Sequence, residues 1–238
     1  MPNHSTIPIN AAASIRRLLI TAGPTQEPID AVRFIGNRSS GRLGVALADK
    51  AAARGWRVTL LLGPTSLSPL SSQVAVYRFR TTADLDALLK DQFPHSDVLV
   101  MAAAVADYRP RLPNGTADAA QGKLRRSDAG LTLELEPTPD LLAGVSKMGV
   151  SGQTIVGFAL EPRERLVESA AAKLVRKGMD LVVANPLETM DSEMIHATLL
   201  DRAGIVAAPA AMSKEAFGDW LLDRIDARAS STTGASRP

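Results

Sequence analysis

The stretch RFIGNRSSGRLGVALADKAAARGWRVTLLLG, residues 33–63, decides the fold. It opens with a turn in which Gly36, Gly41 and Gly44 bracket Ser39 and Ser40. Apolar residues then recur at helical spacing over 41–55, and Arg-Gly at 54–55 is typical of a helix end. The segment WRVTLLLGP that follows has the composition of a buried strand. We interpret the stretch as the turn, helix and second strand of a βαβ unit.

The first strand of this unit is the apolar run RRLLITAG at 16–23. Two strands that flank a helix in this way pair in parallel through a right-handed crossover. Further strands are predicted at 76–80, 97–108, 154–161 and 181–186, and further helices at 82–93, 162–180 and 213–228. The sequence therefore predicts an α/β fold with a doubly wound, Rossmann-like parallel sheet.

Residues 109–136 interrupt this alternation. RPRLPNGTADAAQG is too long and polar for a packed connection, which predicts a mobile loop. KLRRSDAGLTLELE alternates around an Asp-Ala-Gly turn, as in a β-hairpin, and a second hairpin is predicted at 197–209. We predict a flexible N-terminus (1–15), a single domain (16–228) whose inserted hairpin at about 109–136 forms a flap or dimer arm, and a disordered tail (229–238).

Composition excludes several classes of protein. At 238 residues and 45% hydrophobic, the chain can bury the core of one α/β domain. No apolar run approaches the ~18 residues that cross a bilayer, and the first thirteen residues lack a signal-peptide pattern, so we expect a cytoplasmic protein without a membrane partner. The absence of cysteine excludes disulfides and a thiolate nucleophile, and the three histidines show no metal-ligand spacing. A net charge of +2 and few aromatic residues argue against nucleic acid as a partner.

The glycine-serine turn suits an anion. Ser39 and Ser40 lie where the N-cap of the following helix is expected, and free N–H groups at a helix start favour phosphate or carboxylate. Arg33, Arg38 and Arg42 add positive charge. The alternative is that the serines only cap and the glycines only turn.

A nicotinamide-dependent oxidoreductase is disfavoured. Such an enzyme would carry G-x-G-x-x-G directly after the first strand, where this chain has TAGPTQEPID. Neither Tyr77 nor Tyr108 is followed by lysine four residues later, so the Tyr-x-x-x-Lys pair of short-chain oxidoreductases is missing.

Five motifs occur in a specific order: ITAGPTQEPIDAVRFIGNRSSGRLG, AAAVADYRP, GKLRR with LTLELEPTPDLLAGV, IVGFALE and KGMDLVVAN. From about Arg16 to Ile225 the chain resembles the phosphopantothenoylcysteine synthetase domain, half of a bifunctional coenzyme A biosynthesis protein in many bacteria. The resemblance implies a ligase that joins 4′-phosphopantothenate to L-cysteine. CTP activates the carboxylate as an acyl-cytidylate and releases pyrophosphate, and the cysteine amine then displaces CMP.

The resemblance also implies cofactors and partners. Mg²⁺ is expected with CTP, held chiefly by triphosphate oxygens rather than by a metal site of the protein. The flavin-dependent decarboxylase half is outside the match, so no flavin is expected, and a separate decarboxylase is a candidate partner. Relatives form dimers through an exchanged hairpin, which makes a homodimer the expected assembly, with 123–136 and 197–208 as candidate arms.

Site residues follow from the matched motifs. The resemblance implies that Lys123 is the catalytic lysine beside the triphosphate, that Asn37 contacts the acyl intermediate, and that Arg33 acts in the second step. It implies substrate contacts at Asn37, Ser39, Ser40, Gly41 and Ala104. The implied nucleotide contacts are Met101, Ala102, Ala103, Asp107, Lys123, Pro139, Asp140, Leu141, Leu142, Phe158, Lys173 and Lys177. The two last lysines are four residues apart and should share one helix face.

The chain departs from the family pattern at three places. KLRR replaces a KIKK-like segment but keeps the first lysine, and the loop 109–122 before it is a few residues longer. The stretch 186–197, which contains His196, diverges. A nucleotide-binding regulatory protein that has lost turnover stays an alternative, and the residues do not decide between CTP and ATP.

Overall fold

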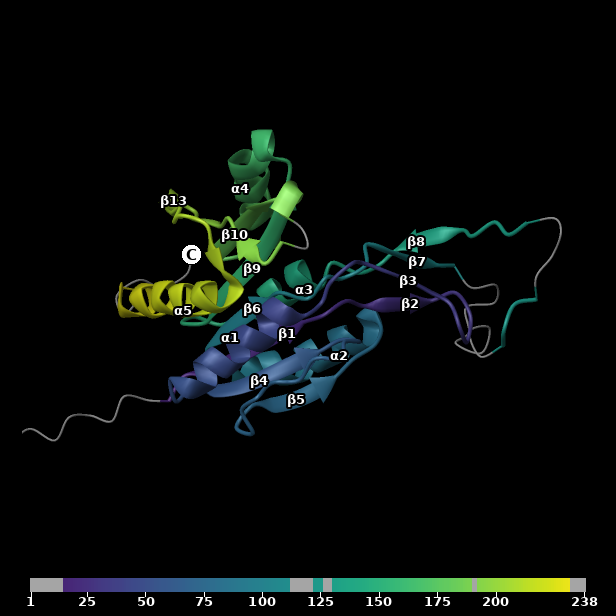
Figure 1. Cartoon of the computed structure of the whole chain (residues 1–238), viewed down its shortest axis with the longest axis horizontal. Helices are drawn as coiled ribbons and strands as arrows, with labels where there is room; N and C mark the ends of the chain where they lie inside the picture. Colours follow the sequence, from purple (N-terminus) through teal and green to yellow (C-terminus); the bar gives the residue numbers. More distant parts are fainter. Residues whose placement is uncertain (1–14, 112–121, 126–129, 190–191, 232–238) are drawn as a thin grey trace, which may run out of the picture.

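The computed structural model describes residues 15–111, 122–125, 130–189 and 192–231. An eight-stranded sheet forms the centre, in the order β13-β12-β10-β9-β6-β1-β4-β5 (Figure 1). Its parallel strands are β1 (Arg17–Ala22), β4 (Arg57–Leu62), β5 (Ala75–Arg78), β6 (Val98–Met101), β9 (Thr154–Glu161) and β10 (Leu181–Pro186). The hairpin β12 (Thr198–Asp201) and β13 (Gly204–Ala207) continues the sheet antiparallel to β10.

The order of the strands reverses at β1. The chain runs from β1 outward through β4 to β5, returns to place β6 on the other side of β1, and then continues outward through β9 to β10. In such a sheet, ligands bind outside the carboxyl ends of the strands at the point of reversal. The predicted doubly wound, Rossmann-like sheet is confirmed, and it directs attention to the ends of β1 and β6.

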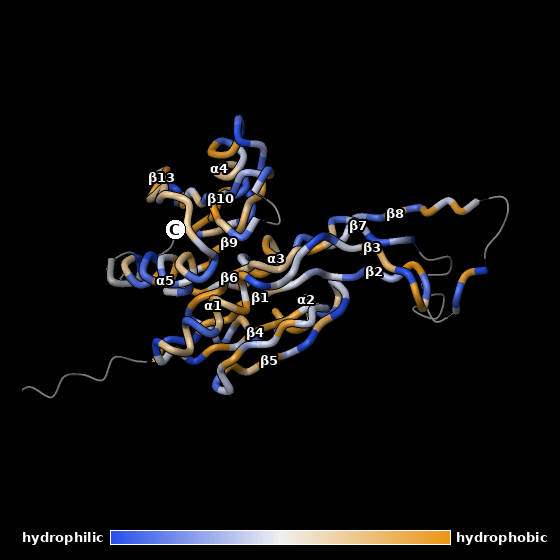
Figure 2. Tube along the Cα trace, viewed as in Figure 1, coloured by the Kyte–Doolittle hydropathy of each residue, from blue (hydrophilic) through white to orange (hydrophobic). Residues whose placement is uncertain are grey.

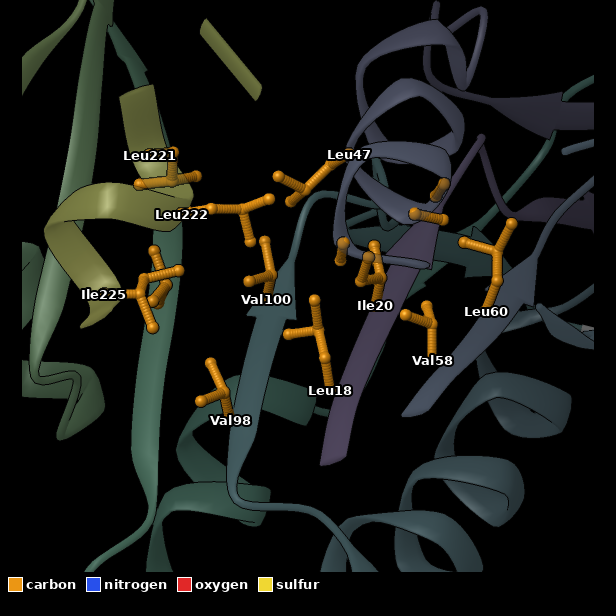
Figure 3. Close-up of a cluster of buried hydrophobic side chains, with 14 of the residues drawn as sticks. Leu18, Ile20, Leu47, Val58, Leu60, Val98, Val100, Leu221, Leu222 and Ile225 are labelled. Atoms are coloured by element: carbon orange, nitrogen blue, oxygen red, sulfur yellow. The ribbon is translucent and has the colours of Figure 1, made fainter. Parts of the chain in front are cut away.

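Helices cover both faces of the sheet because successive residues of a strand point to opposite sides. Leu18 and Ile20 of β1 face α1 (Arg42–Ala53) and α5 (Lys214–Ser231), and Figure 3 shows their side chains opposite Leu47 of α1 and Leu222 of α5. Leu19, between them, faces the opposite side, which is covered by α2 (Thr82–Gln92), α3 (Leu141–Met148) and α4 (Leu166–Lys177). The core therefore has two layers.

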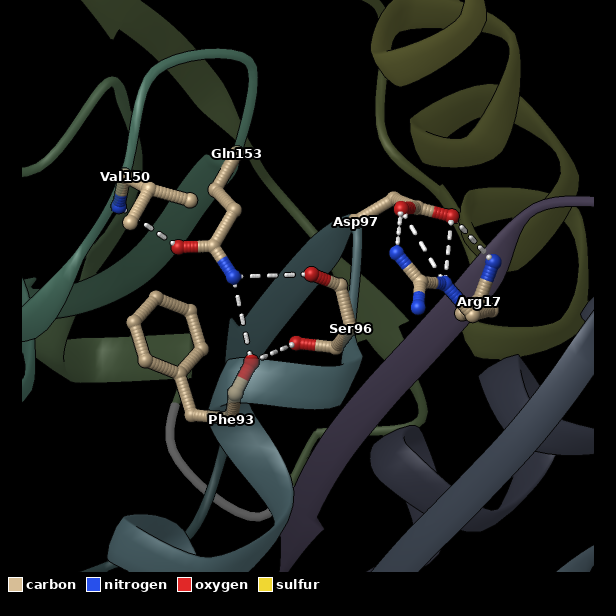
Figure 4. Close-up of polar contacts among 6 residues, drawn as sticks. All are labelled: Arg17, Phe93, Ser96, Asp97, Val150 and Gln153. Atoms are coloured by element: carbon tan, nitrogen blue, oxygen red, sulfur yellow. Dashed lines mark hydrogen bonds and ion pairs between the residues drawn. The ribbon is translucent and has the colours of Figure 1, made fainter.

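Polar side chains join neighbouring strands at their amino ends, opposite the carboxyl ends where ligands are expected (Figure 4). The carboxylate of Asp97, before β6, accepts hydrogen bonds from the backbone N–H of Arg17 at 2.8 Å and from its guanidinium at 2.5 Å. The buried amide of Gln153, before β9, donates to the carbonyl oxygens of Phe93 and Ser96 at 3.1 and 2.8 Å. These contacts fix the starts of β1, β6 and β9, and leave the carboxyl ends of the strands for ligands.

Two short antiparallel pairs form an arm that projects from the sheet (Figure 1). One pair is β2 (Gln26–Pro28) with β3 (Phe34–Gly36), and the other is β7 (Tyr108–Pro110) with β8 (Leu135–Pro137). The predicted hairpin around Asp-Ala-Gly is wrong in its pairing, because the described residues 123–125 and 130–134 carry no strand. The strand 135–137 pairs instead with 108–110, which closes the insertion at its base.

Other sequence predictions are adjusted at their boundaries. The helix predicted at 162–180 is shorter, because Pro162 precedes a 3-10 turn at Arg163–Arg165 and α4 begins only at Leu166. Helix α5 includes residues 229–231, so the predicted tail begins too early, and the rest of it lies outside the described residues, as do most of the N-terminus and of the loop 109–122. The remaining short elements are the 3-10 turns Phe93–His95 and Leu187–Thr189 and the pair β11 (Met194–Ile195) with β14 (Met212–Ser213).

In the described part of the chain, no helix is both long and apolar enough to span a lipid bilayer.

Candidate active site

Two cavities open at the carboxyl edge of the sheet. The first, of about 320 Å³, is called the Ser39 cavity, and its walls include Arg38, Ser39, Ser40, Gly41, Ala102, Asn185, Thr189, Met194 and Lys214. The second, of about 190 Å³, is called the Lys173 cavity, and it is lined by Met101, Ala103, Val105, Ala106, Asp107, Thr138, Pro139, Asp140, Leu141, Leu142, Phe158, Lys173 and Lys177. Most of the residues expected to contact the nucleotide thus surround one cavity.

The end of β6 separates the two cavities. Ala102 lines the Ser39 cavity, whereas its neighbours Met101 and Ala103 line the Lys173 cavity, as the alternation along a strand requires. Threonine hydroxyls hold the loop that follows: Thr21 Oγ1 accepts the N–H of Ala103 at 3.1 Å, and Thr25 Oγ1 accepts the N–H of Ala106 at 2.9 Å. The wall between the cavities is therefore fixed by buried groups of β1 and the turn after it.

The Ser39 cavity contains the N-terminus of α1. The predicted capping by serine is wrong, because the N-cap is Gly41 in a left-handed conformation (φ 74°) and no side chain caps the helix. The hydroxyls of Ser39 and Ser40 accept instead from Gly41 N at 3.3 Å and Arg42 N at 3.4 Å, which both precede the N–H groups that a cap would bind. The first turn contains no acidic residue. An uncapped helix start has free N–H groups and a partial positive charge, and no acidic side chain opposes that charge here, so the site is suited to a phosphate or carboxylate.

Asn185 was missed by the sequence analysis. It lies near the end of β10, is 9% exposed, lines the Ser39 cavity, and its Oδ1 has no hydrogen-bond partner among the described residues. A buried amide oxygen without a donor is costly, which points to a ligand donor. The only available signal was a polar residue at the end of the apolar run LVVAN. The divergent stretch 186–197 also contributes to this cavity through Thr189, Met194 and Ile195, while His196 is exposed.

The Lys173 cavity is positively charged on the α4 side. Lys173 and Lys177 both line it, which confirms that they share a helix face. Burial, and then the neighbouring charge of Lys177, lower the pKa of Lys173. Lys177 Nζ lies 3.2 Å from a carboxylate oxygen of Asp140, whose other oxygen caps α3 by accepting from Ala143 N at 3.1 Å. An anionic ligand would stabilise both ammonium groups.

Asn37 itself lines neither cavity, but it lies next to residues that line each of them. Its Nδ2 donates to the carbonyl oxygen of Val105 at 2.8 Å, and Val105 lines the Lys173 cavity. The next two residues of the chain, Arg38 and Ser39, line the Ser39 cavity. A group that links a ligand in one cavity to a ligand in the other would therefore pass Asn37.

Three predicted residues lie elsewhere. Lys123 and Arg33 line neither cavity; their segments contact each other at the β2–β3 turn, where Arg33 Nη2 donates to the Leu124 carbonyl at 3.1 Å. Ala104 lines neither cavity, because its backbone pairs with Gly23 O at 2.9 Å and Thr25 N at 3.1 Å. The substrate contact of Ala104 implied by the motifs stays a prediction.

Protein ligands for a metal are sparse. Across the described ranges, no group of three or more histidine, aspartate or glutamate side chains is arranged to hold a metal ion. At the Lys173 cavity, Asp107 and Asp140 are the carboxylates, and Asp140 already faces Lys177. This donor set fits a metal bound mainly through ligand oxygens and water rather than a protein cage.

Comparisons with known proteins identify the family of this chain. A family model described as DNA/pantothenate metabolism flavoprotein C-terminal domain matches residues 13–228. A protein named cysteine/cysteine sulfinic acid decarboxylase, from an unknown prokaryotic organism, is 43% identical over 183 residues, covering 77% of this chain and 49% of that protein. Coenzyme A biosynthesis bifunctional protein CoaBC of Mycobacterium tuberculosis (strain ATCC 25618 / H37Rv) is 43% identical over 194 residues, covering 78% of this chain and 44% of that protein.

A solved structure shares the fold. The crystal structure of the C-terminal domain of coenzyme A biosynthesis bifunctional protein CoaBC has a TM-score of 0.74 and 32% identity, covering 91% of this chain and 96% of that one. The chain spans about half the length of the curated relatives it matches. Together these matches confirm the resemblance inferred from the motifs: the chain belongs to the family of the DNA/pantothenate metabolism flavoprotein C-terminal domain, the phosphopantothenoylcysteine synthetase domain.

Proposed function

We propose that this protein is a phosphopantothenate–cysteine ligase that uses CTP. The observation that carries the proposal is the pair of cavities on either side of the end of β6, one with an uncapped helix start and the other with two lysines. The first would hold 4′-phosphopantothenate, with Asn185 Oδ1 accepting from one of its hydroxyl or amide groups. The second would hold CTP, with Lys173 and Lys177 beside the phosphates.

This arrangement suits a reaction in two steps. In the first, a carboxylate oxygen attacks the α-phosphorus of CTP, and the bond to pyrophosphate breaks. In the second, the cysteine amine attacks the acyl carbon, the bond to CMP breaks, and the nitrogen loses a proton. Neither step needs a nucleophile from the protein, so positioning and positive charge are its main contributions. In this proposal the amide of Asn37 hydrogen-bonds the activated acyl group between the cavities.

Mg²⁺ would neutralise the triphosphate when CTP is bound. Asp107 is the carboxylate of the Lys173 cavity that is not paired with Lys177, so it is the residue proposed to reach this ion, directly or through water. The separate flavin-dependent decarboxylase and the cytoplasmic location belong to the same proposal and rest on the family alone.

The product of each step tests the proposal. The purified protein should release pyrophosphate from CTP only when 4′-phosphopantothenate is present, and should form the amide and CMP only after cysteine is added. Parallel reactions with ATP measure the choice of nucleotide. CTP binding without pyrophosphate release would favour the regulatory alternative instead.

We further propose that the protein is a homodimer in which the arm of one copy completes the site of the other. The arm and the segment before β8 expose apolar side chains, including Val32, Phe34, Leu131 and Leu135. Figure 2 shows hydrophobic stretches of chain in this projecting region. Isolated two-stranded pairs are marginally stable, which favours a partner surface. Lys123 belongs to this arm and lines neither cavity of its own chain.

Mixed dimers test the sharing of sites. An Asn37→Asp chain lacks the amide that contacts the wall of the Lys173 cavity, and a Lys123→Ala chain lacks the lysine of the segment bound to the arm. If sites are shared, mixing the two variants should restore amide formation, because one site of each mixed dimer then has both native residues. If Lys123 serves the cavities of its own chain, or the protein is monomeric, mixing should restore nothing.

A further inference from the structure

The β2–β3 turn contains a buried carboxylate that the mechanism above does not use. Asp30 is 2% exposed, although it lies on the projecting arm. Its Oδ1 accepts the backbone N–H groups of Val32 at 2.9 Å and Arg33 at 2.7 Å. These two bonds are local and shape the turn.

The other oxygen of this carboxylate reaches a distant part of the sequence. Asp30 Oδ2 accepts from Arg33 Nε at 3.0 Å, from Arg33 Nη2, and from the backbone N–H of Leu124 at 3.1 Å. Arg33 Nη2 in turn donates to the carbonyl oxygen of Leu124 at 3.1 Å, and the N–H of Ala31 donates to the carbonyl oxygen of Gly122 at 3.3 Å. We call these contacts the Asp30 network.

The Asp30 network brackets Lys123. Gly122 and Leu124, its two neighbours, are bound through backbone groups, while Lys123 itself is exposed. Hydrogen bonds from several donors stabilise the ionised carboxylate, and the pKa of Asp30 lies well below its usual value, with the Arg33 side chain as the main cause. The charge that holds the segment is therefore present throughout the physiological range.

We propose that Asp30 is a positioning residue for the ligase reaction, which presents Lys123 by fixing residues 122 and 124 against the β2–β3 turn. The inference rests on the proposed function for the role of Lys123, but its structural part does not. A fixed backbone keeps the ammonium group of Lys123 within reach of the α-phosphate in the transition state. Small displacements of such a group lower the rate of the reaction.

Asp30→Asn separates the two roles of the carboxylate. The amide oxygen of asparagine can still accept from Val32 and Arg33 and keep the turn, but its NH₂ group would face the guanidinium of Arg33 and the N–H of Leu124. Asp30→Ser, which also retains a short acceptor for the turn, provides a second variant should the asparagine variant fold poorly. Asp97→Asn is the matched control, because Asp97 also accepts a backbone N–H and a guanidinium, but at the opposite edge of the sheet.

Two readouts decide the proposal. Hydrogen exchange of peptides covering 122–124 should accelerate in Asp30→Asn and Asp30→Ser but not in Asp97→Asn, and this readout holds whether or not the protein is a ligase. The kcat of pyrophosphate release should fall about tenfold or more in both Asp30 variants, but adding either Asp30 change to Lys123→Ala should not lower kcat below that of Lys123→Ala alone. Unchanged exchange, an unchanged kcat, or losses that multiply in the double variant would each overturn the proposal. A wild-type protein that releases no pyrophosphate would refute the proposed function and leave the exchange result as the test of the network.

Discussion

Replacing Gly44 by alanine tests how closely α1 must approach β1. A Cβ at this position would lie 2.5 Å from the Cβ of Ala22 and 3.4 Å from the carbonyl oxygen of Thr21. Carbon atoms in contact normally lie about 3.5–4.0 Å apart, so the start of α1 must move away by about 1 Å. Both neighbours belong to the buried strand β1 and cannot rotate away.

The change in the free energy of unfolding caused by Gly44→Ala follows from two opposing effects. Overpacking in a core costs about 1–3 kcal/mol, and the close contact with a rigid neighbour places Gly44 in the upper part of that range. Alanine offsets about 1 kcal/mol through its better helix propensity. We expect a net loss of about 1–2 kcal/mol in the free energy of unfolding, which lowers Tm by about 2–8 °C in a chain of this size.

Gly144 is the matched control for this prediction. It lies in α3 and is exposed, and a Cβ added there would meet no described atom within 4 Å, so alanine should stabilise the protein by about 0.5–1 kcal/mol. Thermal and urea denaturation measure both variants. Gly44→Ala should also lower pyrophosphate release by up to about 100-fold, because the helix start in the Ser39 cavity is displaced. Wild-type Tm and wild-type turnover in Gly44→Ala would refute the close-packing argument.

Three further predictions concern the cavities. Asn37→Asp should fold normally and still release pyrophosphate, but form the amide at least about 100-fold more slowly, as product analysis by mass spectrometry can measure; an equally fast variant would exclude the proposed contact. Lys173→Met should bind CTP about tenfold more weakly by calorimetry. Burial lowers the pKa of Lys173 in the folded protein. Below that pKa the buried charge costs stability, and this cost falls as pH rises from the lowered value to the ordinary pKa of lysine. The variant should therefore match or exceed the wild-type Tm at pH 7 and lose that advantage at high pH. A lower Tm at pH 7 would contradict this assignment. Asn185→Leu should keep or raise Tm, since Oδ1 has no partner to lose among the described residues, but raise KM for 4′-phosphopantothenate about tenfold without changing KM for CTP; a clear loss of stability would show that the amide serves the fold alone.

The sequence predicted the sheet well because its strands are strongly apolar. The segments 154–161 and 181–186 form β9 and β10 at the predicted bounds, since both strands are buried in the centre of a parallel sheet. The arm was predicted only in part. Strands β2 and β3 have three residues each, pair only with each other in the described part of the chain, and have mixed polarity, so neither periodicity nor composition indicates them.

The candidate site was predictable where a motif is local. The residues of PDLL and the lysines of α4 gather at one cavity, because the turn after β6 and the start of α3 lie at the same edge of the sheet. Asn185 and Lys214 could not be predicted from spacing, since they reach the Ser39 cavity from strands and helices far along the chain. The serine caps failed for a conformational reason: the left-handed backbone of Gly41, close to Gly23, fixes the helix start one residue later.

The most direct test of the account is a crystal structure of the protein with CTP and 4′-phosphopantothenate. We predict that the nucleotide lies in the Lys173 cavity with its phosphates beside Lys173 and Lys177, and that the pantothenate phosphate lies at the start of α1. The carboxylate and the α-phosphorus should then meet at Asn37. A nucleotide bound in the Ser39 cavity, or two ligands whose reactive groups point away from Asn37, would contradict the account.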